Sequence, residues 1–378
     1  MSWEIKKLNE CCISIADGDH LPPPKSETGV PFVTIANVDS YNHFDFTDTM
    51  FVPQNYYDKL DAKRKARKGD ILLTVVGSFG IPILITDDTP FVFQRHIAIL
   101  RPNPAVIDSR FLYYTMMSKS FYAQADAYAI GAAQRTISLT SLRQMKVAVP
   151  DLETQRKIAD VLAPFDGLID SNNTQIKLLE QMAENLYKEW FVRFRFPGYE
   201  TAEFENGIPK DWGYVKLDKV LTVLYGKDHS KLEDGDVPVY GSGGIMRYGN
   251  RALYDGESVL IPRKGSLNNI MWVNQPFWTV DTMFYTKALI PHVEKYIYYV
   301  LSSLDMASYN TGAALPSMTT DILYHLKIVL PSSSLLAKFD AIVSDLYEQR
   351  MLLENKNKNL IKQRDLLLPR LMSGKLEV

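Results

Sequence analysis

Two cations and two amides lie close together in the second half of the chain. The segment Arg263-Lys264-Gly265-Ser266 is followed by Asn268 and Asn269. Guanidinium and ammonium groups bind phosphate oxygens, and an amide side chain can pair with the edge of an adenine base. The segment therefore indicates contact with nucleic acid. The alternative interpretation is an ordinary cationic hairpin turn that binds nothing.

Three further groups of residues allow the same chemistry. Residues 63–68 (KRKARK) form the densest basic run, which either positions phosphates or is a solvated face. Gln134 and Arg135 follow a small-residue loop, and these side chains can pair with adenine and guanine, respectively. The alternative for that loop is simple packing on the following strand. Three aromatic residues could flank DNA, namely Tyr225, Tyr248 and Trp272.

The sequence lacks the motifs of nucleotide binding, metal binding and catalysis. Gly241-Ser242-Gly243-Gly244 has no Lys-Ser or Lys-Thr pair after it, which argues against a phosphate loop and favours tight turns. Metal-ligand spacing is absent among four histidines of the chain, His20, His43, His229 and His325. Neither the tetrapeptide that holds an adenine amino group for methylation nor a nuclease-like carboxylate cluster is present. We expect no catalytic residues, no metal and no bound cofactor.

Composition is that of a soluble globular protein. The 378 residues favour two domains or more, with 46% hydrophobic and 23% charged residues. The net charge of −2 lowers the expectation of DNA binding, although a local basic face can hide in such an average. Cys11 and Cys12 are adjacent, which suits neither a structural disulfide nor a zinc site. With no apolar run of membrane-spanning length, these features indicate a cytoplasmic protein without a membrane partner.

The chain contains a long internal repeat. Gly131-Ala132-Ala133 recurs as Gly312-Ala313-Ala314, an offset of 181 residues, and the same offset carries Leu162 onto Val343. Such a repeat determines the architecture before any local motif does. It predicts a pseudo-two-fold molecule with two similar heads, which suits the reading of a two-part target.

Two long helices follow from a seven-residue pattern that obeys the same offset. The first stripe consists of Ile158, Leu162, Phe165, Ile169, Asn172, Ile176, Leu179, Ala183, Leu186 and Trp190. The second consists of Phe339, Val343, Leu346, Arg350, Leu353, Asn357, Leu360, Arg364, Leu367 and Leu371. We expect antiparallel coiled-coil rods of roughly 60 Å that set the distance between the heads. Pro164 and Pro369 should kink or break them.

Four polar residues interrupt the stripes. Asn172 and Asn357 either face solvent or fix the register of the two helices, as a buried Asn can. The second interpretation is slightly favoured. Arg350 and Arg364 are expected to reach the carboxylates of a partner.

The heads have a mixed pattern, so the predicted fold class is α+β. Short strands are expected at 71–76, 91–93, 258–261 and 277–278, and short helices at 110–117 and 295–304. The segment from Trp212 to Leu217 echoes Trp3 to Leu8. The predicted domains are a first head at 1–150, a central helix at 151–196, a second head at 197–331 and a C-terminal helix at 332–378.

The order of head, helix, head and helix resembles the specificity subunit of type I restriction–modification systems. The most specific matches are Ile158-Ala159-Asp160-Val161-Leu162 after a Pro-ended strand and the closing segment Leu367 to Gly374. The resemblance covers essentially the whole chain. It implies that each head is a target-recognition domain for double-stranded DNA and that the helices bind two adenine-methyltransferase subunits. A restriction–translocase subunit can join them, and S-adenosylmethionine would be used by the methyltransferase, not by this chain.

The family pattern carries over unevenly. In the second head, Arg263 to Ser266 and Asp281-Thr282 match segments frequent in these domains, as does Val237 to Gly244. In the first head, Val76 to Gly80 lacks the Arg-Lys pair, and Arg95-His96 stands where Asp281-Thr282 would. The complete set of candidate DNA-contacting residues is Arg64, Lys65, Lys68, Ser78, Arg95, Gln134, Arg135, Lys227, Ser242, Arg247, Arg263, Lys264, Ser266, Asn268 and Asn269.

The candidate residues of the subunit-binding helices are taken from the two stripes. They are Ile169, Asn172, Ile176, Leu179, Leu186, Leu346, Leu353, Asn357, Leu360 and Leu367. Three functions remain open at this point: a DNA-recognition subunit, an enzyme with an unrecognised site, and a coiled-coil scaffold or inactivated remnant. Unlike heads on a repeated frame favour the first.

Overall fold

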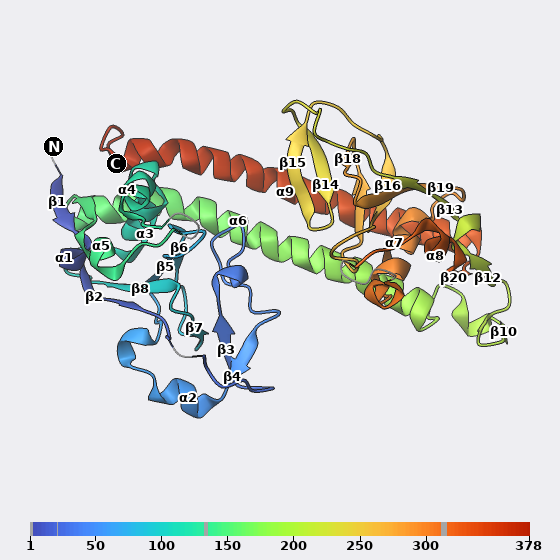
Figure 1. Ribbon diagram of the computed structural model, residues 1–378, viewed down its shortest axis with the longest axis horizontal. Coiled ribbons are helices and arrows are strands. Elements are labelled where there is room, and N and C mark those ends of the chain that lie inside the picture. Colours follow the sequence, from blue (N-terminus) through green and yellow to red (C-terminus); the bar gives the residue numbers. More distant parts are fainter. Residues whose placement is uncertain (1–2, 21, 132–134, 311–315) are drawn as a thin grey trace. The chain divides into compact units, whose positions relative to one another are not determined.

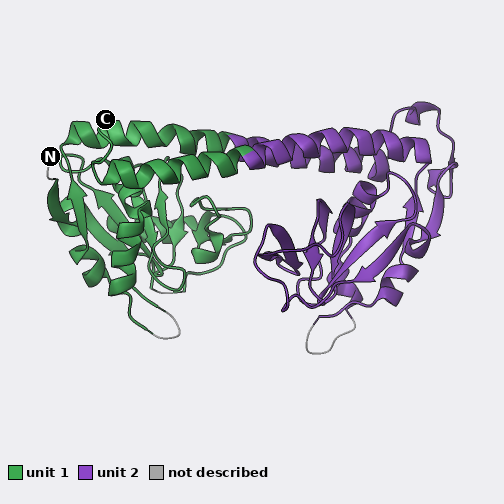
Figure 2. Ribbon diagram, turned by 90° about the horizontal axis from the view of Figure 1, so that it is seen from above, with its two compact units in different colours: residues 1–171, 356–378 green, residues 172–355 purple. Residues whose placement is uncertain are grey.

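The computed structural model describes residues 3–20, 22–131, 135–310 and 316–378. The chain divides into two compact units, shown in Figures 1 and 2. Unit 1 comprises residues 1–171 and 356–378, and unit 2 comprises residues 172–355. Each unit therefore combines one head with a part of both long helices, α6 (Leu152–Tyr187) and α9 (Ser333–Met372). Both helices and sheets are present, which agrees with the mixed helix and strand content predicted from the sequence.

Three sheets form the head of unit 1. The largest is antiparallel and consists, in spatial order, of β2 (Cys12–Asp17), β8 (Ile97–Pro102), β5 (Ile71–Thr74) and β6 (Pro82–Leu84). The second consists of β4 (Met50–Val52), β3 (Val30–Val33) and β7 (Val92–Phe93), with β3 and β7 parallel. The third pairs β1 (Glu4–Lys7) with β9 (Lys146–Val149). All four residues of β5 are buried, which explains the apolar run of Ile71, Leu72 and Leu73, while the hydroxyl of Thr74 donates to the carbonyl of Ser78.

Short helices cover the sheets of unit 1. They are α1 (Leu8–Cys11), α2 (Gln54–Lys59), α3 (Ser109–Met117), α4 (Lys119–Tyr128) and α5 (Leu139–Gln144). The carboxylate of Asp108 caps α3 by accepting from the main-chain nitrogens of Arg110 and Phe111. Cys11 is buried and Cys12 is half-buried, and both are free thiols.

Unit 2 repeats the sheet order of unit 1. Its large sheet consists of β13 (Leu221–Tyr225), β19 (Met283–Ala288), β16 (Glu257–Pro262) and β17 (Met271–Asn274). The second sheet consists of β15 (Gly244–Gly249), β14 (Val237–Gly241) and β18 (Trp278–Thr279), with β14 and β18 parallel. The two-stranded sheet pairs β12 (Gly213–Lys216) with β20 (Lys327–Leu330). Its additional elements are α7 (Glu294–Ser302), α8 (Thr320–His325), β10 (Phe204–Glu205) and β11 (Ile208–Pro209).

The long helices supply core residues to both units. In unit 1, Ile158 and Leu162 of α6 and Leu368 and Leu371 of α9 are buried in one cluster with Phe111. In unit 2, the corresponding cluster contains Ala183, Phe339 and Val343, together with residues of β16, β19 and α7. The helices are thus part of each head's hydrophobic core. No helix within the described ranges is long and apolar enough to cross a membrane.

Pro164 does not break α6, so of the kink or break predicted from the sequence, the break does not occur. The helix runs from Leu152 to Tyr187 with Pro164 inside it, and α9 likewise continues past Pro369 to Met372. Both Pro164 and Asp160, whose carbonyl loses its helical donor, are exposed. Water can therefore satisfy that carbonyl, while buried residues on either side hold the helix together.

The arginines of the stripes bind carboxylates of this chain, not of a partner, so that expectation is wrong. In unit 1, Arg364 Nη1 lies 2.6 Å from Asp166 Oδ1. In unit 2, Arg350 lies 3.2 Å from both Glu180 and Glu354. Pairing within the chain follows from position, because a stripe residue faces the neighbouring helix rather than solvent. Asn357 is buried, in agreement with the interpretation favoured from the sequence.

Candidate nucleic-acid interface

The basic loop of unit 2 is held by main-chain hydrogen bonds on both sides. It begins directly after β16, and the nitrogens of Arg263 and Lys264 donate to the carbonyl of Thr282 at 2.8 and 3.2 Å. The nitrogen of Met318 donates to the carbonyl of Arg263 at 2.8 Å. The nitrogen of Gly265 donates to Pro316 at 3.2 Å. The loop therefore lies between the turn before β19 and the segment before α8.

Gly265 allows the loop to approach the β14–β15 turn. Its φ of +86° lies in the left-handed region, which favours glycine. A Cβ atom at this position would lie 2.8 Å from Oγ of Ser242. The side-chain amide of Asn269 adds a second link, donating to the carbonyl of Ser242 at 2.8 Å. The predicted residues Ser242, Gly265 and Asn269 are thus brought together.

The two cations of this loop are Arg263, whose guanidinium has neighbours within unit 2, and Lys264. The guanidinium of Arg263 lies over the ring of Tyr225, 5.4 Å from its centroid, and donates to the carbonyl of Asp281 at 3.2 Å. Tyr225 ends β13 and is exposed. Among the described residues, no carboxylate forms an ion pair with Arg263 or Lys264. Both charges are therefore available to an anionic ligand.

The amide of Asn268 is used within unit 2. Its Nδ2 donates to Asp305 at 3.1 Å, and its Oδ1 accepts from the main-chain nitrogen of Ala307 at 2.9 Å. Together with the bond from Asn269 to Ser242, this contact fixes the shape of the loop. The observed contacts make both amides positioning groups. Pairing with adenine, as suggested by the sequence, stays a prediction.

The remaining candidates of unit 2 are distributed around this loop. Ser266 and Lys227 are exposed, and the nitrogen of Lys227 donates to the carbonyl of Thr279. Arg247 donates to the carbonyl of Leu232 and lies 3.7 Å from Asp234, so its charge is partly satisfied.

Trp272 is engaged in contacts within unit 2, and its place beside DNA stays a prediction. Its Nε1 donates to Glu257 at 2.6 Å, and its ring packs 4.6 Å from that of Tyr347. The indole ring is therefore part of the packing between the head and α9 within unit 2. Tyr248, by contrast, is exposed.

Unit 1 has the same main-chain frame at the equivalent loop. The nitrogen of Val75 donates to His96 at 2.9 Å, and the carbonyl of Val75 accepts from Ile137 at 2.8 Å. The nitrogen of Gly77 donates to Arg135 at 3.0 Å. These three bonds correspond to those of Arg263, Met318 and Gly265 in unit 2. The predicted correspondence of Arg95-His96 with Asp281-Thr282 is therefore confirmed.

The side chains on that frame differ between the units. Val75 and Val76 occupy the places of Arg263 and Lys264, and both valines are buried. The cation of unit 1 comes instead from the facing segment: Arg135 lies over the ring of Phe79, 5.3 Å from its centroid. It also forms an ion pair with Asp126.

Two other candidates of unit 1 lie near this frame, and one falls outside the structural description. Ser78 is exposed, with its carbonyl accepting from Oγ1 of Thr74 at 2.7 Å. Arg95 is exposed, and its nitrogen donates to Asp19. Gln134 lies outside the described residues. The small-residue loops of the repeat fall largely outside them as well.

The basic run at 63–68 is only partly available. Arg64 lies 3.4 Å from Asp17 and 3.9 Å from Asp19. Lys65 donates to the carbonyl of Asp58 at 2.9 Å. These contacts support the interpretation of a folded surface segment, whereas Lys68 is exposed.

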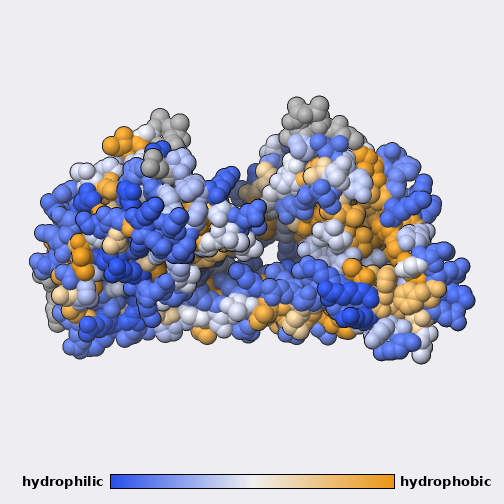
Figure 3. Space-filling view, turned by 90° about the horizontal axis from the view of Figure 1, so that it is seen from below, coloured by the Kyte–Doolittle hydropathy of each residue, from blue (hydrophilic) through white to orange (hydrophobic). Residues whose placement is uncertain are grey.

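The long helices also carry apolar side chains that face solvent. The stripe residues proposed from the sequence are mostly packed, and Ile169 and Asn357 are buried. A different set is exposed, namely Val161, Leu168, Leu178 and Met182 on α6 and Ile342, Leu352 and Leu366 on α9. Figure 3 shows apolar side chains among hydrophilic ones where the helices run. Sequence reasoning missed this set, although the spacing from Val161 to Leu168 is one heptad.

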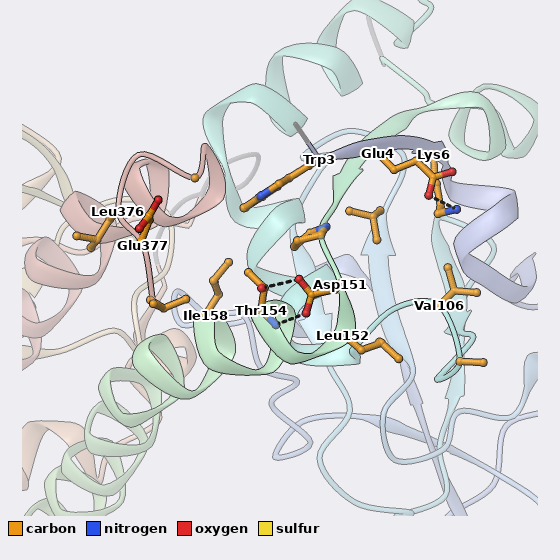
Figure 4. A pocket seen from close by; sticks show the side chains of 15 residues that line it. Trp3, Glu4, Lys6, Val106, Asp151, Leu152, Thr154, Ile158, Leu376 and Glu377 are labelled. Atoms are coloured by element: carbon orange, nitrogen blue, oxygen red, sulfur yellow. Dashed lines mark hydrogen bonds and ion pairs between the residues drawn. The ribbon is translucent and has the colours of Figure 1, made fainter. Parts of the chain in front are cut away.

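A pocket of about 630 Å³ lies in unit 1 between β1, the first turn of α6 and the C-terminal segment (Figure 4). Three of its charged side chains, Glu4, Lys6 and Asp151, have partners within unit 1. Asp151 accepts from the nitrogen and hydroxyl of Thr154 at 3.0 and 2.7 Å, which lowers the pKa of Asp151. Lys6 lies 2.8 Å from Glu4. Within the part of the chain that the structure describes, no group of three His, Cys, Asp or Glu residues is arranged to hold a metal.

Comparison with known proteins gives one family. The family model for the type I restriction modification DNA specificity domain matches residues 2–181 and 209–363. The MjaIX specificity subunit of Methanocaldococcus jannaschii is 24% identical, with 100% of this chain and 94% of that protein covered. The HindI specificity subunit of Haemophilus influenzae is 22% identical over 83% of this chain and 88% of that protein.

The fold has a solved counterpart. The S subunit of a type I restriction–modification system from M. genitalium superposes with a TM-score of 0.57 at 18% identity. The match covers 98% of this chain and 96% of that structure. With two matched domains and two units built on one frame, the chain belongs to the type I restriction modification DNA specificity domain family.

Proposed function

We propose that this chain reads a two-part DNA target, with one half-site bound by each unit. The observation that carries the proposal is the shared main-chain frame with unlike side chains. Unit 2 presents Arg263 and Lys264 where unit 1 presents Val75 and Val76. A constant frame with variable residues is what two different specificities require.

The proposed contacts follow from the chemistry of these loops. In unit 2, the charges of Arg263 and Lys264, which form no ion pair with a described carboxylate, would bind phosphates and base edges of the major groove. In unit 1, Arg135, Arg95 and Ser78 would contribute. Because the bases read also depend on DNA shape, the residue types alone do not specify the target sequence.

The long helices are proposed to hold the catalytic subunits. Two adenine-methyltransferase subunits would bind the exposed apolar residues of α6 and α9, and a restriction–translocase subunit can join the complex. The helices would act as an antiparallel coiled coil that sets the gap between half-sites, with the units related by a pseudo-two-fold axis. Each methyltransferase would flip out one adenine and use S-adenosylmethionine, whereas this chain would be non-catalytic and bind no cofactor.

The alternatives receive less support. A coiled-coil scaffold that binds only proteins has no need of two unlike loops on the same frame. An independent enzyme would need a catalytic constellation, and in the pocket of unit 1 the carboxylates of Glu4 and Asp151 are engaged by Lys6 and Thr154. The proposed complex would act in the cytoplasm, where the chromosome of a bacterial or archaeal host lies.

The test is methylome sequencing of a strain that expresses the chain with its neighbouring methyltransferase, beside a strain that lacks the chain. The expected result is a two-part adenine-methylated motif that disappears with the chain. Equal methylation in both strains, with both proteins expressed and associated, would overturn the proposal.

A further inference from the structure

The edge strand β15 of unit 2 exposes three apolar side chains in a row of four residues. Ile245, Met246 and Tyr248 are 48%, 58% and 49% exposed. Single exposed apolar residues are common, but a cluster on a free sheet edge is a liability unless a ligand covers it. The ribbon of β14 and β15, residues 237–249, lies at the edge of its sheet (Figure 1).

Local geometry makes room for Met246 on this ribbon. A Cβ atom on Gly241 would lie 2.4 Å from Sδ of Met246, so the absence of a side chain at Gly241 makes room for Met246 on the ribbon surface. A register shift between Val239 and Tyr240 interrupts the pairing of the strands beside it. Such a bulge re-aims side chains near a strand end.

Arg247, the cation of β15, is bonded to groups outside the apolar edge. Arg247 donates to the carbonyl of Leu232 and lies near Asp234. The ribbon therefore presents apolar groups, and positive charge lies next to its tip, on the loop of Arg263 and Lys264. The turn at Ser242 is bonded to Asn269 and contacts Gly265, which follows the unpaired Arg263 and Lys264.

This juxtaposition identifies the class of ligand. Two cations that pair with no carboxylate in the described part of the chain favour a polyanion over an apolar protein surface. The major groove of DNA admits a two-stranded ribbon, and the thymine methyl is the apolar group that it presents. We propose that Ile245 and Met246 read thymine methyl groups in the second half-site. This inference rests on the proposed function and adds the chemical group that is read.

Unit 1 lacks such an edge. Its equivalent edge strand, β4, has Met50 and Phe51 half-buried and Val52 buried. The proposal therefore applies to one half-site only, and the other half-site serves as an internal reference.

The test replaces thymine with uracil, which removes only the methyl group. Once methylome sequencing has given the target, duplexes with single thymine-to-uracil changes are bound to the complex of chain and methyltransferase. In the second half-site, at least one change should weaken binding about fourfold, the equivalent of one lost methyl contact. In the complex with Ile245→Ala and Met246→Ala, the same change should have no effect.

A matched control uses an exposed isoleucine on a strand of unit 1. Ile13 is 65% exposed, and Ile13→Ala should leave every thymine-to-uracil effect unchanged. Unaltered discrimination within the first half-site shows that the double variant is folded.

Three outcomes would overturn the inference. Equal binding of thymine and uracil duplexes by the wild-type complex would show that no methyl group is read. Full discrimination by the double variant would show that residues other than Ile245 and Met246 read it. A loss of methyltransferase from the double variant would make the ribbon a protein-docking edge. Absence of any methylated motif would instead reject the proposed function itself.

Discussion

Arg364 and Asp166 are 198 positions apart in the sequence, yet Nη1 of Arg364 lies 2.6 Å from Oδ1 of Asp166. The hydroxyl of Tyr114 donates to the other carboxylate oxygen at 2.6 Å. Burial, with the Asp166 carboxylate nearby, raises the pKa of Tyr114, so the phenol stays protonated and remains a donor. This network joins α3, α6 and α9 within unit 1 and makes both helices part of the first head.

Removal of one partner from this network should destabilise the protein. Arg364 and Asp166 have side-chain exposures of only 13% and 23%. Arg364→Met should lower the free energy of unfolding by about 3 kcal/mol, because it leaves a poorly hydrated carboxylate without its cation. Arg364→Met with Asp166→Asn should recover most of this loss in urea unfolding. A single variant as stable as wild type would mean that water screens the pair like a surface ion pair.

The second prediction concerns the basic loop of unit 2. Arg263→Ala with Lys264→Ala should weaken binding of the complex and reduce the slope of log affinity against log salt by about 2, if each cation contacts one phosphate. Recognition should change only in the second half-site. A suitable control is Lys210→Ala with Lys219→Ala, which removes the same charge from exposed positions in unit 2. Equal damage to both half-sites would contradict the assignment of one half-site to each unit.

The third prediction concerns the cation of unit 1. Arg135→Ala should impair only the first half-site. In unit 1 this guanidinium supplies the positive charge at the main-chain frame that carries Arg263 in unit 2. Asp126→Asn should strengthen binding, because it frees the charge of Arg135 from its ion pair. Competition binding with duplexes altered in one half-site at a time measures both effects. If Asp126→Asn weakens binding to the same degree as Arg135→Ala, the ion pair itself is the functional unit.

The sequence predicted regular elements well where one physical pattern extends over many residues. The heptad stripe predicted both α6 and α9 and their starts, although α6 ends at Tyr187 and α9 at Met372, before the predicted ends at 196 and 378. The effect of Pro164 could not be predicted, because it depends on which side of the helix faces water. Likewise, the partners of Arg350 and Arg364 depend on residues far away in the sequence.

The candidate site was predicted less completely, for a related reason. The sequence identified Arg263 and Lys264 by type and Arg95-His96 by position relative to the second head. It could not show that Asn268 is bonded to Asp305 and Ala307, or that Trp272 packs on Tyr347, because these contacts arise only from folding. On the exposed edge of β15, Tyr248 was identified, but Ile245 and Met246 were missed, since an apolar strand residue is expected to be buried.

The fourth prediction tests the exposed helix residues as the methyltransferase-binding surface. Leu168→Ala and Met182→Ala, on α6, should each weaken methyltransferase binding by about 2 kcal/mol, the value of one buried aliphatic side chain. Leu289→Ala, at an equally exposed leucine of the second head, is the control. Titration of the chain with methyltransferase in the absence of DNA gives the dissociation constants. Unchanged affinity for both helix variants would place the methyltransferase elsewhere.

The last prediction concerns pH and an ion cluster of unit 2. Lys295 Nζ lies 2.8 Å from Glu257 and 2.7 Å from Asp340, and Nδ1 of His292 lies 2.8 Å from Asp340. Burial disfavours the charged carboxylate of Asp340, but hydrogen bonds from Lys295 and His292 outweigh it and lower its pKa.

A lowered pKa in the folded state stabilises the protein above the unfolded-state pKa of about 3.9, and this stabilisation is lost as pH falls through the folded pKa. Asp340→Asn should therefore be less stable than wild type at pH 7, and the difference should shrink below about pH 4. Denaturant unfolding at a series of pH values measures it. Asp345→Asn, at an exposed carboxylate of the same helix, should differ little from wild type throughout. A difference for Asp340→Asn that persists undiminished at pH 3 would show that shape, not charge, is what Asp340 contributes.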